Sequence, residues 1–214
     1  MVMLKLDQCK PLISGVYKVQ KHHTGRFGMK KAFLVVIAGL FLVTGGPAFA
    51  AEKAPQKVVD LANSSLVKLG SDPVIVQAVK QENSKGKTLA QIQEMDKKWM
   101  ATAGIDDLMK AIMDSDCGKH IRNFQKSEPY YAEIFVMDNQ GANVAMTDKT
   151  SDYWQGDEAK FKESYKGGAG AVHIGDVKFD DSTQSYLVQV SVPVKDGDKA
   201  IGAITIGVDV DKLK

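Results

Sequence analysis

The last third of the chain alternates apolar and polar residues with a period of two, which is typical of β-strands. In Ser185–Val194 one face would carry Tyr186, Val188, Val190, Val192 and Val194. The other face would carry Leu187, Gln189, Ser191 and Pro193. This alternation predicts one dry face and one wetter face. Asp196-Gly197 predicts a hairpin that returns through Ile201–Val208, so the chain is expected to build an antiparallel sheet.

Two further strands are expected upstream, and helices are expected before them. Tyr131–Met137 alternates, and Asp138–Gly141 is a turn signal ahead of a returning strand over Asn143–Thr147. Before these strands, apolar residues recur at helical spacing from Pro55 to Leu69 and in several shorter runs up to residue 124. Asp72-Pro73 predicts the start of a helix, with Asp72 as N-cap and Pro73 at the first helical position. Gln81–Lys87 is expected to be a polar loop, and Thr88 with Gln91 predicts a capping box at the start of the next helix. Two further short helices are expected over Asp106–Met113 and Cys117–Phe124. Helices grouped before strands indicate an α+β fold. We expect a long N-terminal helix and short helices packed on a five- to six-stranded antiparallel sheet.

The first 50 residues resemble an export signal, residues 29–50, that is preceded by an unusual extension, residues 1–28. Lys30 and Lys31 precede an apolar run, Ala32–Val43, that is too short to span about 30 Å of hydrocarbon comfortably. Ala48-Phe49-Ala50 is a small-x-small cleavage site. We therefore predict a cleavable signal peptide over residues 29–50 and a single domain over residues 51–214. Residues 1–28 are best explained by a mis-assigned start codon, with Met29 as the true start. An uncleaved anchor at residues 30–50 is the alternative.

Removing the first 50 residues changes the charge of the chain. The full sequence carries +2, but residues 1–50 hold seven Lys/Arg and one acid, so residues 51–214 carry −4. A mildly acidic domain has no electrostatic attraction to phosphates, and no nucleic-acid partner is expected. The predicted signal peptide places the domain in the periplasm or outside the cell.

Cysteine and histidine usage argues against catalysis. Cys9 falls in the predicted leader, so Cys117 has no partner for an intramolecular disulfide, and it is expected to be a small buried helical residue. His120 and His173 are far apart in sequence, and neither belongs to a recognisable nucleophile motif. No Cys/His cluster has metal-ligand spacing. We predict no enzymatic activity, no metal and no cofactor.

Several motifs of the chain, taken in order, resemble the Cache family of extracytoplasmic sensor domains, which are PAS-like modules. The most specific are DYWQGDEA, IGDVKFDDST and the paired strands VQVSVPV and IGAITIGV, whereas DPVIVQAVKQEN and IQEMDKKW match more loosely. The resemblance covers Val58 to Val210. It implies a ligand pocket on the wetter sheet face, covered by the Ser151–Lys166 segment.

Eight residues are candidates for lining this pocket. Tyr153 and Trp154 combine apolar rings with polar groups, which suits a half-wet site. Asp176 shares a strand phase with apolar neighbours, so it needs a partner: a ligand amine, a lysine or backbone N–H groups. Neutral side chains on the polar strand face could orient a small polar molecule. The remaining candidates are Asp157, Tyr165, His173, Gln189 and Ser191.

The class of ligand is limited by the scarcity of arginine. Family members that bind amino acids usually hold the carboxylate with an arginine near the Tyr-Trp segment, because its fork is bidentate. Here Arg122 is the only arginine in residues 51–214, and Lys149, Lys160 and Lys162 are the nearby cations. A small organic acid held by lysine or backbone N–H groups, or an amine, is therefore expected.

The resemblance implies a stand-alone sensor that binds a small metabolite reversibly. The last strand is followed closely by Lys214, so we expect the signal to pass to a partner such as a membrane receptor or kinase. A scavenging or delivery protein without signalling, a membrane-anchored sensor fragment and an interaction domain with a degenerate pocket are the alternatives. The apolar stripe of the N-terminal helix would serve either a homodimer or packing on the protein's own sheet.

Overall fold

The computed structural model describes residues 52–213, so the predictions for residues 1–28 and 29–50 lie outside the described part of the chain. The helices are α1 (Gln56–Ser64), α2 (Pro73–Ser84), α3 (Leu89–Ala101), α4 (Asp107–Met113), α5 (Asp116–Gln125) and α6 (Ala159–Tyr165). Two 3₁₀ helices are η1 (Leu66–Ser71) and η2 (Lys166–Gly168). The strands are β1 (Tyr131–Met137), β2 (Asn143–Met146), β3 (His173–Ile174), β4 (Lys178–Asp180), β5 (Ser185–Asp196) and β6 (Lys199–Asp209).

The six strands form one antiparallel sheet, as predicted. Its order is β2-β1-β6-β5-β3, and β4 pairs with β5 beside β3. The predicted hairpin joins β5 to β6, with Asp196 paired to Lys199 and Gly197 at a φ of 62°. A two-residue turn of this kind needs a positive φ, which glycine adopts without steric cost. The α+β fold predicted from the sequence is confirmed.

The N-terminal helical run packs on one face of the sheet, but it is divided into three pieces. α1 gives way to η1, and α2 begins afresh because the Asp72 carboxylate accepts hydrogen bonds from the backbone N–H groups of Val74 and Ile75. Pro73 occupies the first helical position, as the sequence predicted. The predicted apolar stripe is buried against β1, β5 and β6: Val58, Ala62, Leu66 and Leu69. The protein's own sheet therefore occupies the stripe on which the dimer prediction rested.

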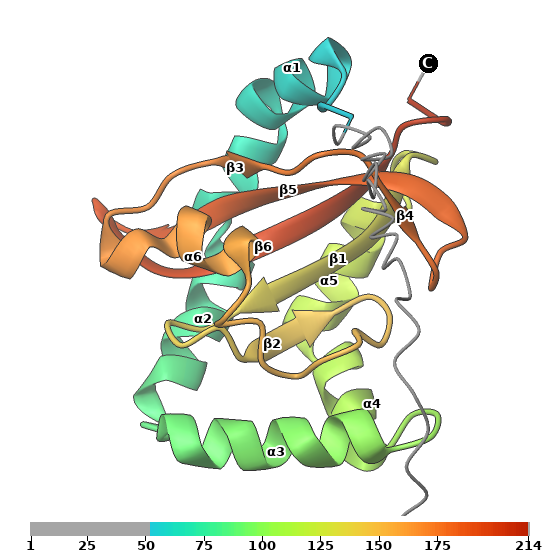
Figure 1. Ribbon diagram of the computed structural model, residues 1–214. Coiled ribbons are helices and arrows are strands. Elements are labelled where there is room, and N and C mark those ends of the chain that lie inside the picture. The colour runs from blue at the N-terminus through green and yellow to red at the C-terminus, as the bar shows by residue number, and fades with distance from the viewer. Residues whose placement is uncertain (1–51, 214) are drawn as a thin grey trace, which may run out of the picture. The chain divides into compact units, whose positions relative to one another are not determined.

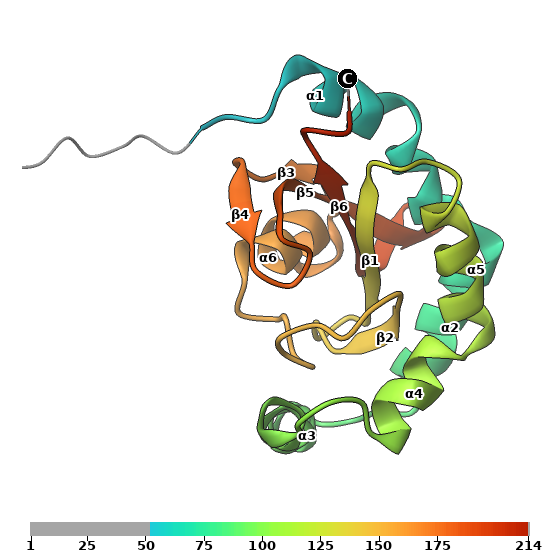
Figure 2. The same cartoon turned by 90° about the vertical axis from the view of Figure 1, so that its right-hand side faces the viewer.

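The second face of the sheet is also covered, which differs from the wet face predicted for β5. Figure 2 shows α6 on one side of β5 and β6, with α2 and α5 on the other side. Leu187, Ser191 and Pro193 are buried, whereas Gln189 is partly exposed. The difference arises because α6 places Phe161 and Ser164, both buried, over this face. Near Gln189 this face of β5 reaches solvent.

The helices between α2 and β1 begin and end close to their predicted positions. Thr88 and Gln91 form the predicted capping box at the start of α3. In Figure 1, α3 runs along the end of the fold beside β2, and α4 and α5 lead from it back to the sheet. Cys117 on α5 is buried, as predicted. Among residues 52–213, the helices are too short or too polar to cross a membrane.

Candidate functional site

A cleft of about 380 Å³, here called the sheet cleft, lies where β3, β4 and β5 meet the start of α6. It contains three predicted site residues: His173 on β3, Asp176 in the β3–β4 connection and Gln189 on β5. Lys160 on α6 lines the opposite wall. The cleft therefore lies between the sheet and the Ser151–Lys166 segment, where the sequence predicted a pocket.

The inner wall of the sheet cleft is held by a hydrogen bond between two strands. The Gln189 side-chain amide donates to the Glu133 carboxylate at 2.8 Å. Gly207 makes room for this contact, since a Cβ atom there would lie 2.6 Å from Glu133 Cγ. Burial raises the pKa of Glu133, although the bond from Gln189 opposes the rise. A polar pair is thus fixed in a partly dry environment behind the cleft.

Lys160 supplies a cation to the same cleft. Its side chain is only 13% exposed, and its ammonium lies 3.0 Å from the Glu158 carboxylate. It also lies 5.2 Å from the centroid of the Phe135 ring, within the range of a cation–π contact. The ammonium is therefore held in place rather than free in solvent.

Asp176 is a partly exposed acid of the sheet cleft. It pairs with Lys53 at 2.9 Å, which satisfies its predicted need for a partner, here a lysine. The Asp176 side chain is 30% exposed and that of Lys53 is 85% exposed. Exposed ion pairs of this kind contribute little, about 0–1 kcal/mol, because solvent screens them. Asp176 can exchange Lys53 for another cation at small cost.

A larger cleft of about 780 Å³, here called the helix cleft, lies among α2, α4, the start of α5 and β2. The predicted residue Tyr153 lies in its inner wall, and Asn143 on β2 lines it nearby. Val74 on α2 and Leu108 on α4 supply apolar surface and are 38% and 39% exposed. This cleft is formed mainly by helices, whereas the predicted pocket was on the sheet.

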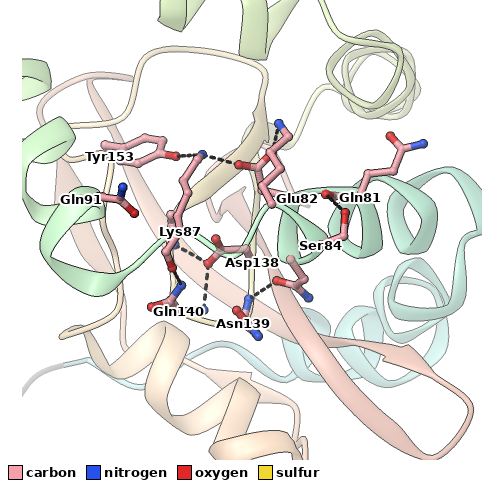
Figure 3. Close-up of polar contacts among 12 residues, drawn as sticks. Gln81, Glu82, Ser84, Lys87, Gln91, Asp138, Asn139, Gln140 and Tyr153 are labelled. Atoms are coloured by element: carbon pink, nitrogen blue, oxygen red, sulfur yellow. Dashed lines mark hydrogen bonds and ion pairs between the residues drawn. The ribbon is translucent and has the colours of Figure 1, made fainter.

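A charged network fixes Tyr153 in the helix cleft (Figure 3). The Lys87 ammonium donates to the Tyr153 hydroxyl at 3.1 Å and to the Glu82 carboxylate, which also accepts from Lys85 at 2.6 Å. Burial tends to raise the pKa of Glu82, but the bonds from the two lysines outweigh it and lower that pKa. Burial raises the pKa of Tyr153, although Lys87 opposes the rise, so the hydroxyl keeps its proton at neutral pH.

The backbone of the predicted Tyr-Trp pair is anchored by an acid that sequence analysis missed. The Asp96 carboxylate on α3 accepts the backbone N–H groups of Tyr153 and Trp154 at 2.8 and 3.0 Å. The Trp154 indole donates to the Gln140 carbonyl at 2.8 Å. The Tyr153 ring packs on Trp99 of α3 with ring centroids 5.5 Å apart, and neither ring of the pair lines the sheet cleft. Nothing in the local sequence around Asp96 signals this contact.

Four predicted residues line neither cleft. Trp154 is bound as described above, and Asp157 is exposed. Tyr165 stacks on Phe161 at 5.2 Å between ring centroids. Ser191 is fully buried and shares a hydrogen bond of 2.8 Å with the Thr205 hydroxyl.

Glu133 and Glu82, which accept the hydrogen bonds described above, are among the acids that sequence analysis did not identify. Glu133 is the single charged residue in the apolar strand Tyr131–Met137, and this signal could have identified it. Glu82 lies in a segment that was interpreted as a polar loop, where an acid carries no signal. Within residues 52–213, no group of three or more His, Cys, Asp or Glu side chains is arranged to hold a metal ion.

No protein-family model matches the sequence, and no curated protein matches it. Among solved structures, the sensor domain of the V. cholerae histidine kinase DctB is similar, with 12% identity and a TM-score of 0.38, over 74% of this chain and 52% of that one. The ligand-binding domain of the Campylobacter jejuni chemoreceptor Tlp3 in complex with L-valine has 13% identity and a TM-score of 0.38, over 75% of this chain and 66% of that one. The Tlp3 sensory domain has 14% identity and a TM-score of 0.39, over 73% of this chain and 65% of that one.

These neighbours are the sensor or ligand-binding domains of a histidine kinase and a chemoreceptor. This chain spans from about half to two thirds of the length of the three solved chains. Their similarity to it is one of fold and does not extend to ligand or partner.

Proposed function

We propose that this domain is a sensor module that reversibly binds a small metabolite carrying an amine, in the sheet cleft. The observation that carries the proposal is Asp176, a carboxylate in a cleft between sheet and covering segment whose present partner is an exposed lysine. A ligand ammonium would replace Lys53 and would be more deeply placed than the lysine it displaces.

The charges around the cleft favour an amine over an organic acid. Once Lys53 leaves Asp176, three carboxylates line the cleft, from Glu158, Asp176 and Asp180, against the two lysines Lys160 and Lys178. The Glu133 carboxylate adds a further acid behind Gln189. Because Lys160 is already paired with Glu158, it is less available to bind an anionic ligand. The balance of charge therefore attracts a cation.

The signalling part of the proposal concerns the rim of the same cleft. Phe179, which lines the cleft, and Tyr186 form an edge-to-face pair with ring centroids 5.3 Å apart, and both are about half exposed. A ligand in the cleft would contact Phe179, which carries Tyr186 as its neighbour. We propose that the loaded domain, exported as the sequence predicts, presents this rim to a partner protein.

A thermal-shift screen of the full chain against small amines, amino acids and organic acids tests the binding. A ligand at a hundred times its dissociation constant adds about 2.7 kcal/mol, or roughly 5–10 °C for a domain of this size. The matched variants are Asp176→Asn, which removes the proposed charge partner, and Asp198→Asn, which changes an exposed acid outside both clefts. We expect an amine to shift the wild type and Asp198→Asn but not Asp176→Asn. The proposal fails if no amine shifts the wild type, or if Asp176→Asn responds equally.

A further inference from the structure

The inner wall of the helix cleft contains two polar groups whose hydrogen bonding within residues 52–213 is incomplete. The Asn143 carboxamide donates to the Thr150 hydroxyl at 2.7 Å, but its oxygen is buried and has no hydrogen-bond partner among residues 52–213. Such an unpaired buried oxygen is uncommon in folded proteins and calls for an explanation. A bound molecule that donates a hydrogen bond would supply one.

Tyr153 offers the complementary group in the same cleft. Its hydroxyl oxygen accepts from Lys87, and no acceptor in the described part of the chain takes the hydroxyl proton. Because Lys87 is held by both Glu82 and Tyr153, the hydroxyl is fixed in position (Figure 3). The inner wall of the cleft thus holds one donor and one acceptor, both uncharged and both buried.

The charged groups of the helix cleft cancel one another. Glu82 and Asp116 balance Lys85 and Lys87, and Glu82 is in contact with both lysines. An ionic ligand would gain little from this arrangement, since its counter-charge is already paired. The walls between α2 and α4 are apolar, with Val74, Leu108 and Ile112 facing the cleft.

From these features we infer that the helix cleft is a second binding site, for an uncharged molecule with an apolar body and a carboxamide group. The amide carbonyl accepts from the Tyr153 hydroxyl, and the amide N–H donates to the Asn143 side-chain oxygen. The hydrocarbon part covers Val74 and Leu108, which are otherwise partly exposed. This site is separate from the sheet cleft and differs from it in the charge of its ligand.

The test uses the full chain labelled with ¹⁵N and the probe pentanamide, with pentanoate and N,N-dimethylpentanamide as controls. We expect pentanamide to shift the amide signals of Val74, Leu108 and Asn143, and the two controls, which lack either neutrality or an N–H donor, to bind more weakly. Tyr153→Phe should weaken binding about tenfold, which is the effect of one hydrogen bond. Tyr186→Phe, at an exposed tyrosine outside the helix cleft, should leave it unchanged.

A second variant keeps the test decisive if Tyr153→Phe does not fold. Ala111 is exposed on α4 and lines the cleft, so Ala111→Trp should fill the space without disturbing the core. Loss of pentanamide binding in Ala111→Trp supports the inference. Equal affinity of Ala111→Trp and the wild type, signal changes confined to the sheet cleft, or no binding to the wild type would each overturn it.

Discussion

The contact between η1 and β5 predicts that Gly70→Ala will destabilise the fold. A Cβ atom at Gly70 would lie 2.2 Å from the Pro193 carbonyl oxygen and 3.0 Å from Val192 Cγ1. The first distance is roughly 1 Å short of van der Waals contact, and a backbone carbonyl in the middle of a strand cannot turn away. η1 must therefore move off the sheet, which would loosen the buried contacts of Leu66 and Leu69.

The expected size of this effect follows from other cases of overpacking. Such substitutions cost about 1–3 kcal/mol, and we expect the upper part of that range because both contacts are rigid. With a urea dependence of about 2 kcal/mol per molar, the unfolding midpoint should fall by about 1 M. The assay is urea unfolding followed by circular dichroism.

Gly175→Ala is the matched control for this prediction. Its nearest heavy atom to a new Cβ is the Gln189 carbonyl oxygen at 3.4 Å, an ordinary contact. Its midpoint should stay within about 0.3 M of the wild type. If Gly70→Ala unfolds at the same urea concentration as Gly175→Ala, η1 does not pack on β5 as described.

Three further predictions concern buried groups. Burial raises the pKa of Glu133 above its ordinary 4.5, so its charge costs stability at pH 7, and Glu133→Gln should unfold at a higher urea concentration than the wild type. The difference between the two urea midpoints should shrink as the pH falls through the raised pKa and vanish below pH 4.5. A variant that is less stable than the wild type at pH 7 would contradict this. Burial, with a smaller effect of the Asp72 charge, raises the pKa of the Cys117 thiol to about 12. In a Cys9→Ser chain, iodoacetamide at pH 8 should therefore modify the folded protein at least about a hundredfold more slowly than the urea-unfolded protein. Equal rates of modification would refute the burial of Cys117. Trp99→Phe removes the indole N–H that donates to the Thr150 carbonyl at 2.8 Å and should cost about 2 kcal/mol in urea unfolding; no measurable cost would mean that this buried bond is absent.

The sequence predicted the elements whose signals are local. The two-residue period of β5, the Asp196-Gly197 turn and the Thr88–Gln91 capping box each depend on residues close together in the chain. Their side chains favour one backbone conformation whatever the tertiary contacts. The antiparallel sheet and the starts of α2 and α3 could therefore be predicted.

What covers each face of the sheet could not be predicted in the same way. The alternation in β5 shows that its two faces differ, but α6 decides that Ser191 is buried while Gln189 reaches a cleft. That outcome depends on how a separate helix packs, and a strand pattern holds no information on it. Three of the eight predicted site residues, His173, Asp176 and Gln189, line the sheet cleft because they lie on β3, on β5 or between β3 and β4.

The partners of individual site residues were beyond local reasoning. Lys53 reaches Asp176 across 123 residues, and Lys87 reaches Tyr153 across 66. The sequence indicated that Asp176 needed a partner, since a carboxylate among apolar residues does, but many lysines could have supplied it. Which lysine does so is set by the folded geometry.

The measurement that tests the proposed function most directly is the location of a bound amine in solution. The full chain labelled with ¹⁵N is titrated with an amine found in the thermal-shift screen, and the backbone amide signals are followed. We predict changes at Gly175, Asp176 and Gln189, where the Gly175 N–H donates to the Gln189 carbonyl at 3.0 Å. Changes confined to α2 and α4, or an unchanged spectrum at saturating amine, would contradict the assignment of the sheet cleft as the sensor site.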